Sequence, residues 1–340
     1  MGNTNDVQTP LEKRKLNLNS FRELGLLAFI FVLSVIIQFL NKEFLTAEFI
    51  NDMVKNTAIL GILAIGMMVV LLTGGIDLSI GSNMALTGMV AALLVQHNPG
   101  IHPVISILLA MAIGLICGVV IGLLVSQLNV IPIIASLGMN YVYRGLTFLL
   151  SKGAWVSAYQ LPDSFKAVGT GTFLGISYLV WVALVVFLIA AYFLRSTRTG
   201  RMIYAVGSNK EAVSVSGINA RQIELLVYSI MGVLSGLAGA LWVAKYASAQ
   251  PDTATGYEVN VIAACVMGGV SVTGGRGKVI GVFLGALLIG IINNALPLLN
   301  QYISSFWQSF IQGMIILIAI IMNVLVKRRR DRADLLRREI

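Results

Sequence analysis

The sequence predicts an all-α polytopic protein that crosses a membrane about ten times. Of its 340 residues, 57% are hydrophobic and only 11% are charged, whereas about 25% of the residues of an ordinary globular protein are charged. The hydrophobic residues form long blocks, and about 20 helical residues span a bilayer core of about 30 Å. The net charge of +9 comes mainly from basic clusters at the ends of these blocks, which is typical of membrane proteins.

Ten apolar blocks divide the chain. The expected spans are 24–40, 57–72, 83–96, 103–125, 131–151, 174–194, 223–247, 259–270, 279–297 and 304–326. The third and eighth are too short to cross alone, so each needs the glycine-rich turn beside it. The first block lacks a small-residue cleavage site and is interpreted as a retained helix. The chain is thus divided into a tail (1–23), a membrane domain (24–326) and a basic tail (327–340).

The distribution of lysine and arginine predicts that both termini face the cytoplasm. With ten spans, 18 of the 24 basic residues fall on the inner side and 5 on the outer side, while Arg144 lies within a span. Cytoplasmic loops carry the excess of Lys and Arg in such proteins. One span more or fewer would remove this charge asymmetry. The asymmetry therefore favours an even number of spans.

A single carboxylate, Asp77, interrupts the membrane part in the stretch TGGIDLSIGS (73–82). An ionised Asp at mid-bilayer costs about 2.5–3.5 kcal/mol on insertion scales, so it should face protein or water. Three roles remain open. Asp77 caps the third span together with Ser79 or Ser82, or it meets water near the inner surface, or it lines a polar path through the membrane.

Other polar side chains lie inside apolar spans. Arg144, in MNYVYRGL (139–146), is expected to extend toward the outer surface. Asn140, Asn293 and Asn294 each need a hydrogen-bond partner on another helix or in a wet cavity. Helix–helix contact is the default interpretation, and a place along a polar path is the alternative.

Glycines at four-residue intervals predict close helix packing. Gly114, Gly118 and Gly122 follow one face of the fourth span, and small residues at this spacing let two helix backbones approach closely. The same interval separates Gly232 from Gly236 and Gly281 from Gly285. Packing within one subunit is favoured over a dimer interface. In addition, GGIDLSIGS (74–82) aligns with GGVSVTGGR (268–276), which is either an internal repeat or chance similarity between glycine-rich turns.

The longest inner loop, 195–222, is polar and basic. Its centre, SNKEAVSVS (208–216), is expected to form about two helical turns, capped by Ser208 or Asn209 and closed at Gly217. A short helix parallel to the membrane would suit the docking of a soluble partner, while an ordinary connecting loop is the alternative.

No residue set in the sequence suits catalysis, metal binding or nucleotide binding. His97 and His102 flank a short turn, and Cys117 and Cys265 lie far apart in apolar blocks. The stretch GGRGKV (274–279) lacks the spacing of a phosphate-binding loop. No basic groove suggests nucleic acid. The chain is therefore not expected to be an enzyme or to hold a cofactor.

Three stretches together resemble one family. TGGIDLSIGS, GRMIYAVGSNKEAVSVSGIN (200–219) and AACVMGGVSVTGGRGKVIGVFLGALLIG (263–290) are similar to stretches of the bacterial ABC-importer permeases for monosaccharides. These are the ribose, xylose, arabinose, galactose and autoinducer-2 type. The resemblance extends in order over residues 24–326. It implies a multi-pass protein of the inner membrane with the ABC importer permease fold.

The resemblance also implies function and partners. A permease of this kind pairs with a second copy, as a homodimer or heterodimer, around a central path. A periplasmic or lipid-anchored binding protein delivers the sugar, with a ribose-type pentose favoured. ATP is bound by a separate ATPase with two nucleotide-binding domains. An ion-coupled secondary transporter is the alternative, although such proteins usually bury several carboxylates or histidines.

The resemblance assigns candidate residues to two sites. The stretch from Gly207 to Gly217 is expected to be the helix that the ATPase receives. Its best matches to the family are Ala205, Gly207, Asn209, Ala212 and Gly217. The candidates for the translocation path are Asp77, Ser79, Asn140, Asn293 and Asn294.

Overall fold

The computed structural model describes residues 18–299 and seven further residues between 307 and 321, with side chains described from residue 23 onward. The predicted tenth span (304–326) lies largely outside the described residues. The C-terminal tail and residues 1–17 of the N-terminal tail lie outside them entirely.

Helices make up nearly all of the described chain. In order, the elements are α1 (Leu18–Leu40), η1 (Lys42–Leu45), α2 (Ala47–Leu72), α3 (Ile80–His97), α4 (Pro103–Ser126), α5 (Pro132–Ser151), η2 (Ala158–Gln160), α6 (Asp163–Thr170), β1 (Thr172–Phe173), β2 (Ile176–Ser177), α7 (Tyr178–Ser196), α8 (Arg198–Ser208), α9 (Lys210–Val215), α10 (Ala220–Tyr246), α11 (Tyr257–Met267) and α12 (Val279–Leu298). Within the described residues, seven helices are long and apolar enough to cross a membrane: α1, α2, α4, α5, α7, α10 and α12. The prediction of a helical multi-pass membrane protein is confirmed.

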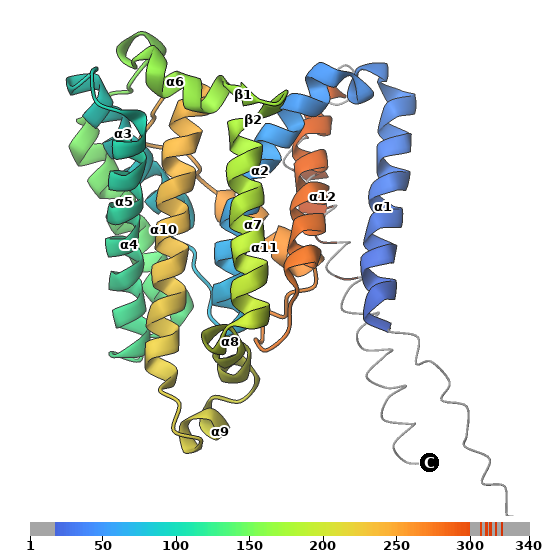
Figure 1. Cartoon of the computed structure of the whole chain (residues 1–340), viewed down its shortest axis with the longest axis vertical. Coiled ribbons are helices and arrows are strands. Elements are labelled where there is room, and N and C mark those ends of the chain that lie inside the picture. The colour runs from blue at the N-terminus through green and yellow to red at the C-terminus, as the bar shows by residue number, and fades with distance from the viewer. Residues whose placement is uncertain are drawn as a thin grey trace, which may run out of the picture.

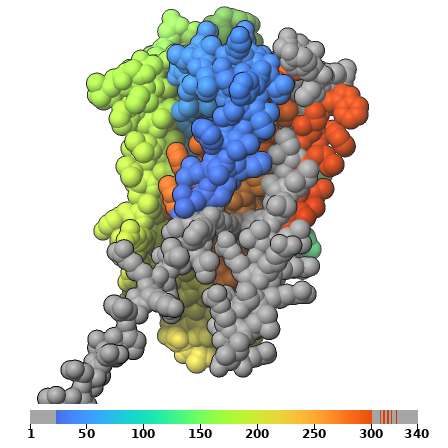
Figure 2. Space-filling view, turned by 90° about the vertical axis from the view of Figure 1, so that its right-hand side faces the viewer, coloured from blue at the N-terminus to red at the C-terminus, as the bar shows by residue number. Residues whose placement is uncertain are grey.

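The long helices run side by side between two capped ends (Figure 1). One end carries α8 and α9, and the opposite end carries α6 and the β1–β2 hairpin. Helix α2 forms the centre: 78% of its most apolar stretch is buried, against 11% in α1. Figure 2 shows α1 and η1 on the outside of the molecule. The core is therefore built around α2, and α1 is the most exposed of the long helices.

Three predicted boundaries were displaced for identifiable reasons. Helix α2 begins ten residues earlier than expected because Thr46 caps it, with its Oγ1 accepting from the amide of Phe49. Helix α7 begins later because residues 172–177 form a hairpin. The two turn residues of this hairpin, Leu174 and Gly175, both have positive φ, as the tightest hairpin turns require. Helix α3 starts at Ile80, three residues early, and reaches 18 residues.

The glycine series pack inside this one chain. A Cβ on Gly114 or Gly118 would collide with a carbonyl oxygen of α10, that of Gly232 or of Tyr228 respectively, and a Cβ on Gly122 would press on Leu225 of the same helix. Likewise, Gly281 and Gly285 of α12 lie against the carbonyls of Gly268 and Ala264, at the end of α11. Because no side chain intervenes, α4 lies backbone to backbone against α10, and α12 against α11.

Candidate functional site

Three segments meet without intervening side chains at the α8–α9 end. They are the end of α2 at Leu72, the end of α8 at Gly207, and the turn 268–276 between α11 and α12. The amide of Gly275 donates to the carbonyl of Leu72 (2.9 Å). A Cβ on Gly207 would overlap that same carbonyl oxygen. The end of α8 is thus seated directly on the backbone of both neighbours, and we call this contact the glycine junction.

A tyrosine on α8 reinforces the glycine junction. Tyr204 donates from its Oη to the carbonyl of Gly277 (2.9 Å), and its burial raises the pKa of the phenol. Its hydroxyl therefore stays a neutral donor at physiological pH. Helix α8 is attached to the residues preceding α12 by this side-chain bond as well as by its close backbone approach.

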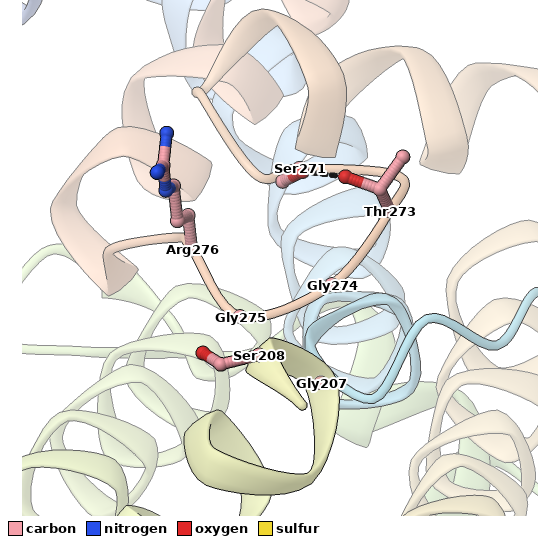
Figure 3. Close-up of a pocket in the computed structure, with 7 residues that line it drawn as sticks. All are labelled: Gly207, Ser208, Ser271, Thr273, Gly274, Gly275 and Arg276. Carbon is pink, nitrogen blue, oxygen red and sulfur yellow. Dashed lines mark hydrogen bonds between the residues drawn. The ribbon is translucent and has the colours of Figure 1, made fainter. Parts of the chain in front are cut away.

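An open pocket of about 420 Å³ lies beside the glycine junction (Figure 3). Its lining consists of Gly207, Ser208, Ser271, Thr273, Gly274, Gly275 and Arg276. The hydroxyls of Ser271 and Thr273 hydrogen-bond to each other (2.9 Å), while the side chain of Arg276 points away from Ser208. Backbone, hydroxyls and one guanidinium offer hydrogen bonds but no general base or nucleophile–base pair, so the pocket suits docking rather than chemistry.

The predicted short helix is confirmed as α9. Asn209 caps it, with its Oδ1 accepting from the amide of Ala212 (2.9 Å), and Gly217 follows it with a φ of 77°. Ser208 takes no part in this cap because it ends α8, where its Oγ donates to the carbonyl of Tyr204. Figure 1 shows α9 at the extreme end of the molecule. Apart from Val213, its side chains are exposed.

Helix α8 was missed by the sequence analysis, which treated 195–207 as loop. Thr197 caps it by accepting from the amide of Gly200 (3.0 Å), and Ile203 and Val206, three residues apart, are buried on one face. These two signals were present in the sequence. Of the residues matched to the family, Ala205 and Gly207 lie on α8, Ala212 lies on α9, and Asn209 and Gly217 flank α9.

Asp77 lies buried at the break between α2 and α3. It is 2% exposed, and its Oδ1 accepts from both the amide (2.8 Å) and the hydroxyl (2.7 Å) of Ser79. The hydroxyl of Ser82 in turn donates to the carbonyl of Ser79 (2.8 Å). The carboxylate therefore fixes the turn that starts α3 and has almost no contact with water. Its place along a path stays a prediction, as does that of Ser79.

Arg144 is bound to backbone instead of extending freely toward the outer surface. Its Nη1 donates to the carbonyls of Pro251 (2.7 Å) and Thr253 (2.8 Å), which belong to the non-helical segment between α10 and α11. Carbonyls without helical partners need such a donor in a membrane. Asn140, one turn earlier on α5, is half-buried.

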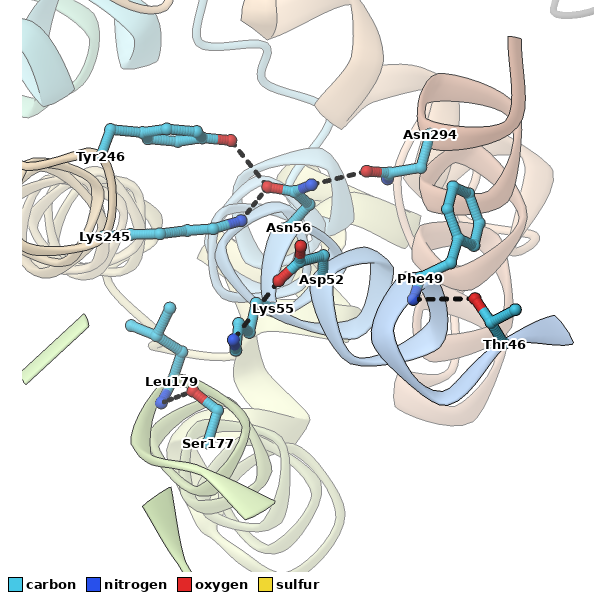
Figure 4. Close-up of polar contacts among 10 residues, drawn as sticks. All are labelled: Thr46, Phe49, Asp52, Lys55, Asn56, Ser177, Leu179, Lys245, Tyr246 and Asn294. Carbon is cyan, nitrogen blue, oxygen red and sulfur yellow. Dashed lines mark hydrogen bonds and ion pairs between the residues drawn. The ribbon is translucent and has the colours of Figure 1, made fainter. Parts of the chain in front are cut away.

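At the opposite end of the molecule, one asparagine ties three helices together (Figure 4). Asn56 of α2 donates from its Nδ2 to Asn294 Oδ1 of α12 (2.5 Å). Its Oδ1 accepts from Lys245 Nζ and from Tyr246 Oη (2.6 Å), both on α10. Asn294 also donates to the carbonyl of Gly290 (2.7 Å). The sequence analysis missed Asn56 because it placed this residue just outside the second span.

Asn293, next to Asn294, differs from it. Its Oδ1 is buried without a hydrogen-bond partner within the described part of the chain. The candidates from the sequence therefore lie at separate places: Asp77 and Ser79 at the α2–α3 break, Asn140 on α5, and Asn293 and Asn294 on α12. The described subunit does not bring them together into one pocket.

Comparison with known proteins adds the following. The family described as "Branched-chain amino acid transport system / permease component" matches residues 49–320. The ribose import permease protein RbsC of Escherichia coli K12 is 40% identical over 86% of this chain and 90% of its own. The ribose import permease protein RbsC of Bacillus subtilis 168 is 38% identical over 94% of this chain and 98% of its own. The L-arabinose ABC transporter permease protein AraH of Azospirillum brasilense is 34% identical over 90% of this chain and 88% of its own. No solved structure matches the chain.

Proposed function

The chain belongs to this permease family, as the permease subunit of an ATP-binding cassette importer in the bacterial inner membrane, and we propose that its cargo is a monosaccharide, with a ribose-type pentose favoured. The observation that carries the proposal is the identity of about two residues in five with two ribose import permeases of different bacteria, over nearly their whole lengths. L-arabinose, named for a third relative, is also a pentose.

The interior polarity supports a neutral, hydroxyl-rich cargo. Most of the polar side chains that are buried in α3, α4, α5 and α10 carry hydroxyls or amides, and Glu224 is the exception in these helices: Ser82, Asn83, Thr87, Ser106, Ser126, Ser136, Thr147, Ser151, Ser235 and Glu224. Groups of this kind exchange hydrogen bonds with sugar hydroxyls, whereas an ion-coupled transporter usually needs several buried carboxylates or histidines. The import names of the relatives likewise favour the ABC importer over that alternative.

The ends of the subunit support the proposed orientation and partners. Arg198, Arg201 and Lys210 lie on the α8–α9 end, while Lys42 and Lys166 lie on the opposite end, with η1 and α6. The positive-inside rule then assigns the α8–α9 end to the cytoplasm, with both termini inside and 304–326 as the tenth span. The ATPase would dock on α8 and α9, and the sugar-binding protein at the α6 end. ATP is bound by the ATPase alone.

Helix α5 supports a second permease copy and a path beside it. Gly138 and Gly145 have open space where a Cβ would lie, and Tyr141 between them is 72% exposed. Asn140 and Arg144 are both partly exposed in the same span. Polar side chains within a span face protein or water rather than lipid. We therefore assign this face of α5 to the dimer interface and the translocation path.

The test is uptake by the reconstituted importer. The permease is reconstituted in liposomes with its partner ATPase and its sugar-binding protein, and ATP-driven entry of labelled ribose is compared with that of xylose, arabinose and glucose. We expect ATP-dependent accumulation of a pentose, and none by the permease alone. Sugar accumulation by the lone permease in response to an ion gradient would contradict the proposal.

A further inference from the structure

A partly buried ion pair joins α9 to α10. Lys210, the first residue of α9, contacts Oε1 of Glu224, in the second turn of α10, at 2.5 Å. The side chain of Lys210 is 54% exposed and that of Glu224 only 10%. The second carboxylate oxygen, Oε2, is buried and lacks a hydrogen-bond partner within the described residues. A carboxylate that is withdrawn from water depends strongly on its counter-charge, so this ion pair helps to hold α9 against α10.

One helical turn beyond Glu224, α10 contacts the turn that carries Asp77. Tyr228 lies four residues after Glu224 and so on the same face of α10. It is 1% exposed, and its Oη lies 3.5 Å from the carbonyl of Ile76. A Cβ on Gly75 would press on the same hydroxyl. Ile76 directly precedes Asp77, which fixes the start of α3. A contact series thus leads from Lys210 to the break between α2 and α3.

The same residues enclose a space that allows this turn to move. Lys210, Glu224 and Tyr228 line a pocket of about 330 Å³ together with Thr73, Gly74 and Gly75. The rest of the lining, Val125 and residues 129–132, comes from the end of α4, the start of α5 and the connection between them. The turn between α2 and α3 therefore contacts Tyr228 and also borders this open volume through residues 73–75. A shift of α9 that acts on Glu224 can be taken up here without compressing the core.

We propose that Lys210 and Glu224 are positioning residues that transmit the movement of α9 to the α2–α3 break during each transport cycle. This inference rests on the proposed function, since the movement originates in an ATPase docked on α9. The ion pair acts as a strut: α9 and the first turns of α10 move as one unit, Tyr228 carries the shift to Ile76, and the start of α3 follows. Without the charge contact, α9 moves while α3 does not.

The experiment measures ATP hydrolysed per sugar imported by the complete importer in liposomes. The test variants are Lys210→Met, Glu224→Gln and the conservative Lys210→Arg. Matched controls are Lys278→Met and Glu23→Gln, which remove a second Lys–Glu pair (2.8 Å) between the residue preceding α12 and α1. A merely structural role would lower the amount of folded protein without changing this ratio, since each importer that remained intact would still couple normally.

We expect the ratio to rise about tenfold in Lys210→Met and Glu224→Gln, which is within the range of coupling between contacting charged residues. Lys210→Arg, which keeps the charge, should stay near wild type, as should both controls. An unchanged ratio in Lys210→Met, whose side chain is half-exposed, would overturn the strut even if Glu224→Gln fails to fold. No ATP-driven uptake by the wild-type importer would instead overturn the proposed function, and the strut with it.

Discussion

Asp77 illustrates how a charge is tolerated at a break between two membrane helices. Both hydrogen bonds from Ser79 converge on Oδ1, so the carboxylate holds the turn that leads into α3 at the residue just before the helix begins. An asparagine presents the same oxygen from the same position, whereas a leucine presents none. The difference between these two substitutions therefore tests whether Asp77 acts through the hydrogen bonds that its Oδ1 accepts from Ser79.

We predict that Asp77→Asn retains uptake and thermal stability close to wild type. Asp77→Leu should lower the free energy of unfolding by about 1–3 kcal/mol, since it removes both hydrogen bonds from Ser79 and leaves the Ser79 hydroxyl unpaired in a buried site. Thermal unfolding of the purified subunit and sugar uptake measure the two effects. Asp163→Leu, at an exposed acid beside Lys166, is the control. Equal behaviour of the two Asp77 variants would show that the hydrogen bonds from Ser79 are unimportant.

At the scale of single residues, the sequence predicts which polar groups need partners but not which partners they find. Arg144 was expected to extend outward, and it binds carbonyls that lie more than 100 positions away in the chain. Asn56 connects α2 to α10 and α12, yet its place at a predicted boundary concealed it. Such pairings depend on tertiary packing, which hydropathy and spacing do not encode.

Among the elements, α8 and α9 differ in how they tolerate substitution, although the family resemblance treats them as one stretch. Gly207 lies in the glycine junction, whereas Ala212 is exposed on α9. A change at the first position acts on the fold of the subunit. A change at the second acts only on what docks there.

We predict that Gly207→Ala destabilises the subunit by about 1–3 kcal/mol, the usual cost of overpacking, because its Cβ would overlap the carbonyl of Leu72. Ala212→Arg should change the free energy of unfolding by less than about 0.5 kcal/mol and still separate ATP hydrolysis from uptake. Thermal unfolding and the ATP-per-sugar ratio test both. Gly100→Ala, at an open position on a loop near the opposite end, is the control. Normal uptake and ATPase stimulation with Ala212→Arg would contradict docking at α9.

Helix α4 and helix α5 provide a paired test of what each glycine is for. We predict that Gly118→Leu prevents folding of the subunit, since its Cβ would meet the α10 backbone, whereas Gly138→Leu on the open face of α5 leaves the subunit folded. If the second copy packs on α5, Gly138→Leu should convert dimers to monomers. Size-exclusion chromatography with light scattering distinguishes these outcomes. A dimer that survives Gly138→Leu would place the interface elsewhere.

Long elements were predictable because a bilayer imposes a strong length requirement. All nine long or apolar helices of the described region overlap a predicted span, and the short eighth span is confirmed as the 11-residue α11. Elements outside the bilayer were missed: α8 has too few hydrophobic residues in a row to resemble a span, and the β1–β2 hairpin was merged into the following span. The bilayer imposes no length on such elements, so only caps and turn residues reveal them.

For the whole molecule, the two ends differ in charge, shape and proposed partners. The α8–α9 end is basic and exposes the glycine junction, while the opposite end is closed by α6, the hairpin and the Asn56 contacts. The central α2 runs between the two ends, so a shift at one end has a rigid, buried helix through which to reach the other. This arrangement fits a subunit that receives force on one side of the membrane and cargo on the other.

Orientation is therefore the property on which the largest number of inferences depend, and two exposed positions test it. Val215 on α9 is 89% exposed and Tyr159 in η2 is 87% exposed; η2 lies beside α6, where Lys166 Nζ donates to the carbonyl of Ala158 (3.4 Å). The native Cys117 and Cys265 are buried, so they should react slowly with an aqueous thiol reagent.

We predict that Tyr159→Cys is labelled in intact cells by a membrane-impermeant maleimide, and that Val215→Cys is labelled only in inside-out vesicles. The excess of basic residues at the α8–α9 end favours a cytoplasmic location for that end, which gives the expected labelling pattern. The unmodified chain, with its two buried thiols, provides the background for each measurement. The reverse labelling pattern would place α9 outside the cell, away from any ATPase, and would make both the docking site and the strut untenable.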